Sequence, residues 1–210
     1  NGTADMNTTL RGTAPDGTYT GIKLKIGVPF ALNHADVATA PSPLNLSGLF
    51  WNWNGGYKFA RIDFKIGMTM DGGMSMDGGM STDSGMAMDS GMMMDGGMEG
   101  GMVMPADTFF IHLGSTECAG AEDGGGNVTS CARPNVGEVS LSGFDPFQKT
   151  ILLDYKALVA ASDLETNGGG APGCMSETDD PECPAILTRL GVNPTTGQSD
   201  ATNQAFFRVE

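Results

Sequence analysis

Apolar and polar residues alternate along several short segments of this chain, a pattern that predicts β-strands buried on one face. Residues 19–28 show it most clearly, with three aliphatic side chains on one side of an extended backbone and two lysines on the other. Residues 49–53 and 57–66 are two further apolar runs. They are joined by an Asn-Gly-Gly sequence, which favours a hairpin turn.

The rest of the chain continues as short elements between turns rich in glycine and proline. Residues 155–164 and 184–190 have weak helical spacing, and residues 29–47, with three prolines, read as a long loop. Further strands are expected at residues 108–113, 138–141, 150–153 and 205–209. This organisation predicts an all-β fold, an antiparallel β-sandwich with long loops and minor helix.

A low-complexity repeat interrupts the strand pattern between Gly67 and Pro105. Its unit is Met-x-Met-Asp-Gly/Ser-Gly, and aspartates recur every six residues from Asp71 to Asp95. Because a Gly-Gly or Ser-Gly step in each unit disfavours a persistent helix or strand, the methionines do not form a core stripe. We interpret 67–105 as a flexible, exposed insertion between two strands of a single domain, 1–210.

The repeat contains thirteen of the fifteen methionines of the chain. Thioether sulfur is a soft ligand that suits Cu(I), so the repeat predicts an accessory Cu(I) collector. Calcium is the weaker alternative, because Ca²⁺ needs six to eight oxygen ligands close together and these carboxylates are separated by methionines. The candidate thioether ligands are Met68, Met70, Met74, Met76, Met80, Met86, Met88, Met92, Met93, Met94, Met98, Met102 and Met104.

Charge and hydropathy exclude several classes of function. The net charge is −14, and no Lys or Arg occurs between Lys65 and Arg133, which argues against nucleic-acid binding. No apolar run approaches the roughly 18 residues of a membrane span. Motifs of serine hydrolases, phosphate-binding loops and zinc proteases are absent from the sequence, so we expect no enzyme. The chain begins at Asn1 rather than Met and looks processed or truncated.

Four cysteines in an acidic, glycine-rich chain suggest an oxidising compartment, periplasmic, extracellular or at the cell surface. Three disulfide pairings are possible, and local spacing favours Cys118–Cys131 and Cys174–Cys183. A zinc site with four cysteine ligands is the alternative, but no C-x₂-C or C-x₄-C spacing supports it.

The chain has two histidines and two tryptophans. His34 lies in the proline-bounded loop, and His112 interrupts an apolar strand in which Phe110 shares its face. Packing is the ordinary role for both histidines. Trp51 and Trp53 are expected to share one strand face with the aromatic residues Tyr57 and Phe59 of the hairpin, as an aromatic cluster.

Five segments together resemble the MbnP-like family, also called metallo-mystery-pair four-Cys proteins, which are secreted copper-binding proteins often encoded beside methanobactin or methanotroph copper genes. They are GVPFALNHADVATAPSPLNLSGLFWNWNGGYKFARID (27–63), FFIHLGSTECAG (109–120), CARPN (131–135), FDP (144–146) and GCMSETDDPECPAILTRLGV (173–192). The resemblance covers nearly the whole chain except the repeat.

The resemblance implies a β-sandwich that binds copper through histidine and an oxidised tryptophan. In this family a paired di-haem, peroxidase-like (MbnH-like) protein converts one tryptophan to kynurenine, whose amine and carbonyl are potential copper ligands. The implied ligands are His34, His112, and kynurenine at Trp51 or Trp53. The resemblance therefore favours a ligand role for the histidines over a packing role.

Two features depart from the family. The Met repeat is an insertion, so its role is not inherited, and a further N-terminal stretch of the family precedes the segment where this chain begins. Self-association or strand addition by another chain would close the edge that the missing strands leave. The leading hypothesis is a copper-binding protein. The alternatives are a structural surface or assembly protein whose Met loop is a spacer or an oxidant sink, and a protein that is mainly a substrate of the haem partner.

Overall fold

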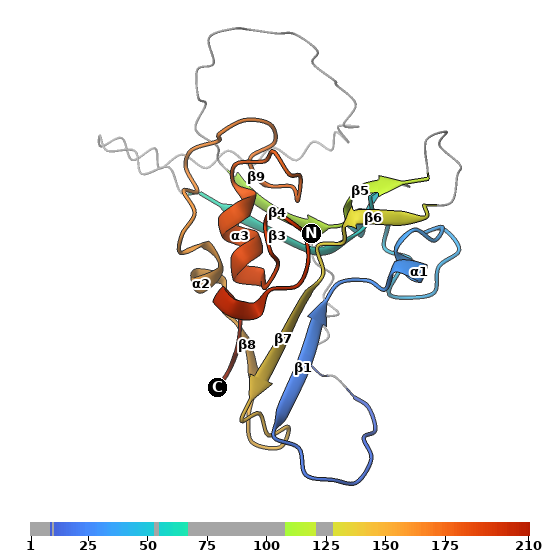
Figure 1. The fold of residues 1–210 in the computed structure, drawn as a ribbon, viewed down its shortest axis with the longest axis vertical. Coiled ribbons are helices and arrows are strands. Elements are labelled where there is room, and N and C mark those ends of the chain that lie inside the picture. The colour runs from blue at the N-terminus through green and yellow to red at the C-terminus, as the bar shows by residue number, and fades with distance from the viewer. Residues whose placement is uncertain (1–8, 10, 53–54, 67–107, 121–127) are drawn as a thin grey trace, which may run out of the picture.

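The structure, a computed structural model, describes residues 9, 11–52, 55–66, 108–120 and 128–210. Its largest sheet has four strands in the order β2 (Phe50–Asn52), β3 (Gly56–Lys65), β4 (Thr108–Gly114) and β9 (Gly173–Cys174). β2, β3 and β4 pair antiparallel, whereas β9 runs parallel to β4 (Figure 1).

Three two-stranded sheets and several short helices complete the described fold. The paired strands are β1 (Gly21–Ile26) with β7 (Gly137–Ser142), β5 (Thr116–Ala119) with β6 (Ser130–Arg133), and β8 (Ile151–Leu153) with β10 (Phe207–Val209). The helices are α1 (Phe30–Asn33), α2 (Tyr155–Val159) and α3 (Cys183–Leu190), with 3₁₀ turns at Ser47–Leu49 and Ala201–Asn203. The predicted all-β, sandwich-like fold class is confirmed.

The hydrophobic core lies between the sheet and α3, which crosses one face of β3 and β4 in Figure 1. β4 contributes alternate residues to this core, and α3 contributes residues spaced three and four apart, as the periods of strand and helix require. α3 begins with Pro184 in its first turn and ends at Gly191, whose φ of 82° favours glycine. The central core side chains are Phe109, Ile111, Leu113, Ile186, Leu187 and Leu190.

The structure confirms most of the expected strands and both expected helices, with shifted ends. The helix expected over residues 155–164 is shorter in the structure, where α2 ends at Val159. The long loop 29–47 contains the one-turn helix α1. It was not predicted, because the three prolines of this segment favoured a loop. β3 and β4 are adjacent antiparallel strands, so the methionine repeat does connect two paired strands.

The four cysteines form the two expected disulfides. Cys118 bonds to Cys131 across β5 and β6, and Cys174 bonds to Cys183, which ties β9 to the start of α3. The zinc alternative is therefore wrong for this structure, because disulfide sulfurs carry no thiolate charge. None of the described helices has the length and apolarity needed to cross a membrane.

Asp180 stabilises the disulfide-bonded loop between β9 and α3. Its carboxylate accepts the backbone N–H of Met175 at 2.8 Å and that of Glu182 at 3.0 Å. Burial raises the pKa of Asp180 to about 6, and the charge of Glu182 acts in the same direction, while the two N–H donors oppose the change. The folded chain therefore holds a proton on Asp180 that the unfolded chain releases at lower pH.

This proton predicts a contribution of definite sign to stability. The free energy of unfolding should fall as pH rises from about 4 to about 6, because the folded state binds more protons there. Asp180→Asn should remove this part of the slope in urea unfolding curves, whereas the exposed neighbour variant Asp179→Asn should keep it. Equal slopes for wild type and Asp180→Asn would contradict the assignment.

Candidate metal centre

The candidate site lies on the face of the sheet opposite the core. Along β4, Ile111 and Leu113 are buried against α3, so Phe110, His112 and Gly114 point the other way, as expected for Phe110 and His112. β3 alternates in the same manner, and Arg61 stands directly opposite His112. His112 therefore belongs to an outer face and has no place among the core side chains.

Trp51 of β2 packs over the end of β4. A Cβ added to Gly114 would lie 2.7 Å from Cζ3 of Trp51, so this glycine provides the space for the indole. The ring centroids of Trp51 and His112 are 6.2 Å apart, and the rings are nearly perpendicular at 73°. The structure thus brings together one predicted tryptophan and one predicted histidine.

The expected aromatic cluster around Trp51 is wrong. The hairpin register pairs Phe50 with Tyr57, and their rings meet at 5.0 Å on the inner side of the sheet. Phe59 also packs against the core. Trp51 consequently points to the opposite face, where its neighbours are His112, Gly114 and the ammonium group of Lys58, 5.9 Å from the ring centroid.

His112 presents a neutral, buried nitrogen. Its side chain is 12% exposed, and Nε2 makes a long contact of 3.5 Å with Oδ1 of Asp63, which does not have the geometry of a hydrogen bond. Burial lowers the pKa of His112, the positive charges of Lys58 and Arg61 lower it further, and Asp63 only partly offsets them. The imidazole is therefore neutral near pH 7, which is the form that binds metals.

Met175 is a third neighbour of this site and was not predicted. It follows β9, whose parallel pairing places Gly173 beside Phe110 and Cys174 beside Ile111. Cys174 is buried in the core, whereas Met175 is only partly buried. Met175 and Trp51 both line a pocket of about 280 Å³. The one hint in the sequence is that Met175 lies outside the repeat.

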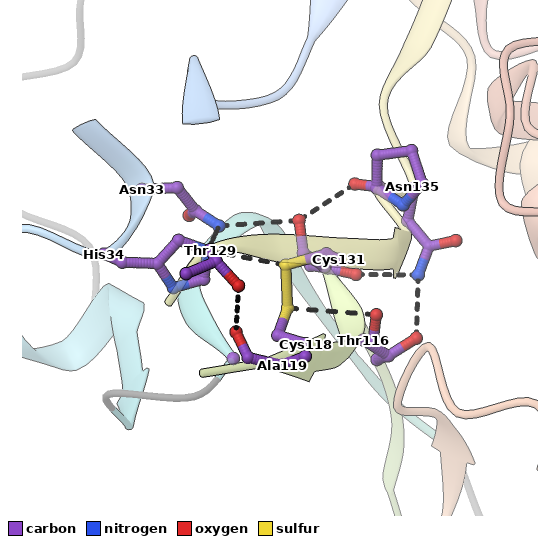
Figure 2. The surroundings of a disulfide bond; sticks show 12 residues. Asn33, His34, Thr116, Cys118, Ala119, Thr129, Cys131 and Asn135 are labelled. Atoms are coloured by element: carbon purple, nitrogen blue, oxygen red, sulfur yellow. Dashed lines mark hydrogen bonds between the residues drawn. A yellow bond between two sulfur atoms is a disulfide. The ribbon is translucent and has the colours of Figure 1, made fainter. Parts of the chain in front are cut away.

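His34 lies elsewhere, beside the Cys118–Cys131 disulfide (Figure 2). Its Nε2 is 3.5 Å from Sγ of Cys131 and 3.2 Å from Nδ2 of Asn33, and its ring centroid is 5.2 Å from that of Phe30. Among the residues that the structure describes, His34, Cys118 and Cys131 form the one group of at least three His, Cys, Asp or Glu donor atoms within 4.8 Å. His112 is not part of that group, so the joint ligand role of both histidines stays a prediction.

The other predicted site residues are outside the described ranges. Trp53 and the thirteen methionines of the repeat belong to this group. Of the predicted folded-site ligands, Trp51 and His112 are therefore the two that the structure places side by side.

The residues around Trp51 fit a copper ion by their chemistry. His112 supplies a buried nitrogen without a hydrogen-bond partner, and Met175 supplies a thioether in the pocket that Trp51 also lines. Imidazole and thioether are ligands that copper accepts, with thioether favouring Cu(I). An unsatisfied buried nitrogen costs free energy, which a bound cation would recover.

Fold and site together define a disulfide-bonded, all-β protein with a histidine–tryptophan site on the outer face of its largest sheet. The family model for MbnP matches residues 1–176, and the chain belongs to this family.

A solved structure, MbnP from Methylosinus trichosporium, is similar to this chain with 28% sequence identity and a TM-score of 0.67. The similarity covers 93% of this chain and 64% of that one, so the chain spans less than two thirds of the length of that protein. A comparison with curated proteins found no match.

Proposed function

We propose that this protein binds copper at a site centred on His112 and an oxidised Trp51, and that it is not an enzyme. The observation that carries the proposal is the buried Nε2 of His112, which makes no hydrogen bond and lies beside Trp51. Met175 is the third candidate ligand. When bound, copper would be held by a soft and borderline donor set that favours Cu(I) over harder cations.

Oxidation of Trp51 to kynurenine would supply the ligand that an indole lacks. Two equivalents of peroxide cleave the indole double bond to N-formylkynurenine and two waters, and hydrolysis then releases formate. The product carries an aryl amine and a ketone. We assign this step to a di-haem, peroxidase-like partner of the MbnH type, because haem peroxidases use peroxide as the two-electron oxidant that each added oxygen requires.

The face around Trp51 suits an acidic partner. Lys58, Arg61 and Lys65 follow β3 on its outer side, although the chain as a whole carries a net charge of −14. Asp63 pairs with Arg61 at 2.9 Å and neutralises one of these charges. A local positive field of this kind would steer a negatively charged partner toward Trp51.

The methionine repeat is proposed as a collector that delivers Cu(I) to this site. The strand ends that flank the repeat lie close to the Trp51 site. Lys65 pairs with Thr108, and His112 lies four residues further along β4. At about 3.3 Å per residue, this is roughly 13 Å. The aspartates of the repeat would raise the local concentration of cations. The two disulfides suit a periplasmic or extracellular location.

Deleting residues 68–104 separates the collector from the folded site. The deletion leaves a short hairpin connection between β3 and β4, so the fold should persist. Cu(I) titration should show several equivalents lost, while one equivalent remains at the folded site. A variant that changes the five aspartates Asp71, Asp77, Asp83, Asp89 and Asp95 to asparagine should keep the full stoichiometry, because it keeps every thioether. Unchanged stoichiometry after the deletion would remove the repeat from the account.

A further inference from the structure

The imidazole of His34 lies beside the Cys118–Cys131 disulfide. Cys118 and Cys131 face each other directly across β5 and β6, and Nε2 of His34 lies 3.5 Å from Sγ of Cys131 (Figure 2). The two sulfurs and a ring nitrogen of His34 all lie within 4.8 Å of one another. All three are atoms of types that bind metals. The disulfide bond is what prevents the two sulfurs from acting as ligands.

Hydrogen bonds around Asn33 fix the orientation of the imidazole. The backbone N–H of Tyr57 donates to Oδ1 of Asn33 at 2.9 Å, which identifies the other side-chain atom of Asn33 as the NH₂ group. This group lies 3.2 Å from Nε2 of His34, so Nε2 is the acceptor. The same nitrogen lies 3.5 Å from Sγ of Cys131, so a metal ion bound there would replace the Asn33 amide as the partner of the Nε2 lone pair.

The two disulfides of the chain differ in accessibility. Cys174 and Cys183 are each 1% exposed and belong to the core beneath α3. Cys118 and Cys131 are only partly buried, and Cys118 lines the pocket of about 280 Å³ beside Trp51. A small dithiol can reach the first disulfide through this pocket and has no comparable path to the second. Access of the attacking thiolate is one of the factors that set the rate of thiol–disulfide exchange.

We propose that the Cys118–Cys131 disulfide masks a metal site, which reduction opens as two thiolates and the imidazole of His34. A dithiol supplies two electrons and two protons, leaves as a cyclic disulfide, and converts the cystine to two thiols. Metal binding then releases the two thiol protons. The occupant is a thiophilic d¹⁰ cation, Zn(II) or Cu(I), because two thiolates and one imidazole match the softness of both.

The geometry of the reduced state fits this donor set. Metal–sulfur bonds of about 2.3 Å and metal–nitrogen bonds of about 2.0 Å place donor atoms roughly 3.5–4 Å apart. Released sulfurs separate to van der Waals contact, which is in this range, and a ring nitrogen of His34 is already within 4.8 Å of both. The ligands of this site are not those of the Trp51 site, although both adjoin the same pocket, so each proposal can fail without the other.

Zinc is the first probe, because it binds thiolates and imidazole but not the thioethers of the repeat. The full chain, reduced by a dithiol and then freed of it, should bind one equivalent of Zn(II) that the oxidised chain does not bind. Zinc should protect Cys118 and Cys131 from alkylation in peptide maps, with Cys174 and Cys183 still disulfide-bonded. His34→Ala should weaken this Zn(II) binding by more than about tenfold, since even outer partners of metal ligands contribute 10–100-fold.

Two controls keep the test decisive. Cys118→Ser with Cys131→Ser should abolish the extra equivalent, and His112→Ala should leave it unchanged. Because the double variant can fail to fold, alkylation protection in the wild-type chain carries the test alone if necessary. A Cu(I) titration of the reduced chain, with zinc release as the readout, then decides which cation binds more tightly. No extra zinc on the reduced chain, or an extra equivalent that does not protect Cys118 and Cys131, would overturn the proposal.

Discussion

Trp51→Phe is expected to abolish copper binding at the folded site. Phenylalanine preserves the aromatic packing over Gly114, so the fold should remain, but its ring cannot be opened to an aryl amine and a ketone. Measured on the chain without residues 68–104, the apparent Kd for Cu(I) should rise at least about 100-fold, equivalent to about 2.7 kcal/mol.

Trp53→Phe is the matched control for this variant, because it makes the same chemical change two residues away. It should leave the affinity within about threefold of wild type. Loss of binding in Trp53→Phe with retention in Trp51→Phe would move the oxidised residue to position 53. That result would contradict the geometric argument from the contact between Trp51 and His112.

His112→Ala is expected to have a comparable effect through a different atom. It removes the buried nitrogen that has no hydrogen-bond partner, and with it the donor that the structure presents beside Trp51. On the chain without residues 68–104, copper retained per chain after dialysis against a chelator should fall from about one equivalent to near zero. Far-ultraviolet circular dichroism should stay unchanged, because His112 is on the outer face of the sheet.

His34→Ala separates the two histidines. Because His34 is seated at the disulfide, this variant should retain copper at the Trp51 site while it loses the reduced zinc site. Equal loss of copper in His34→Ala and His112→Ala would instead support one site with both imidazoles. The pH dependence of copper binding should follow the protonation of His112. Because the pKa of His112 is lowered, copper binding should persist below pH 6.5 before protons compete with copper for the imidazole.

The sequence predicted the strands that have a clear alternation, and with them the face that carries His112. In residues 108–113 the strand period placed Phe110 and His112 on one face and Ile111 on the other, and the structure then showed that the face of Ile111 is the core. β5 and β6 escaped prediction because their four-residue segments, Thr-Glu-Cys-Ala and Ser-Cys-Ala-Arg, have too few apolar side chains to show a period. The disulfide between them was expected from the local spacing of Cys118 and Cys131, but the strands on either side were not.

The contents of the site depended on register and on pairing between distant segments. A hairpin turn was predictable, but the pairing of Phe50 with Tyr57, which turns Trp51 away from both, was not. Met175 reaches the site through a parallel pairing between β4 and β9, which local sequence patterns do not encode. His34 meets Cys131 across 97 residues of sequence. Such neighbours follow from tertiary packing, which propensity and periodicity do not determine.

The central claim is that an oxidised Trp51 and His112 together hold copper. Peptide mapping by mass spectrometry over residues 48–64, on chain isolated with its copper bound, tests this claim most directly. We expect the copper-loaded chain to carry one kynurenine at position 51, seen as the net gain of one oxygen and loss of one carbon from tryptophan, with Trp53 intact. A copper-loaded chain in which Trp51 is unmodified would contradict the account.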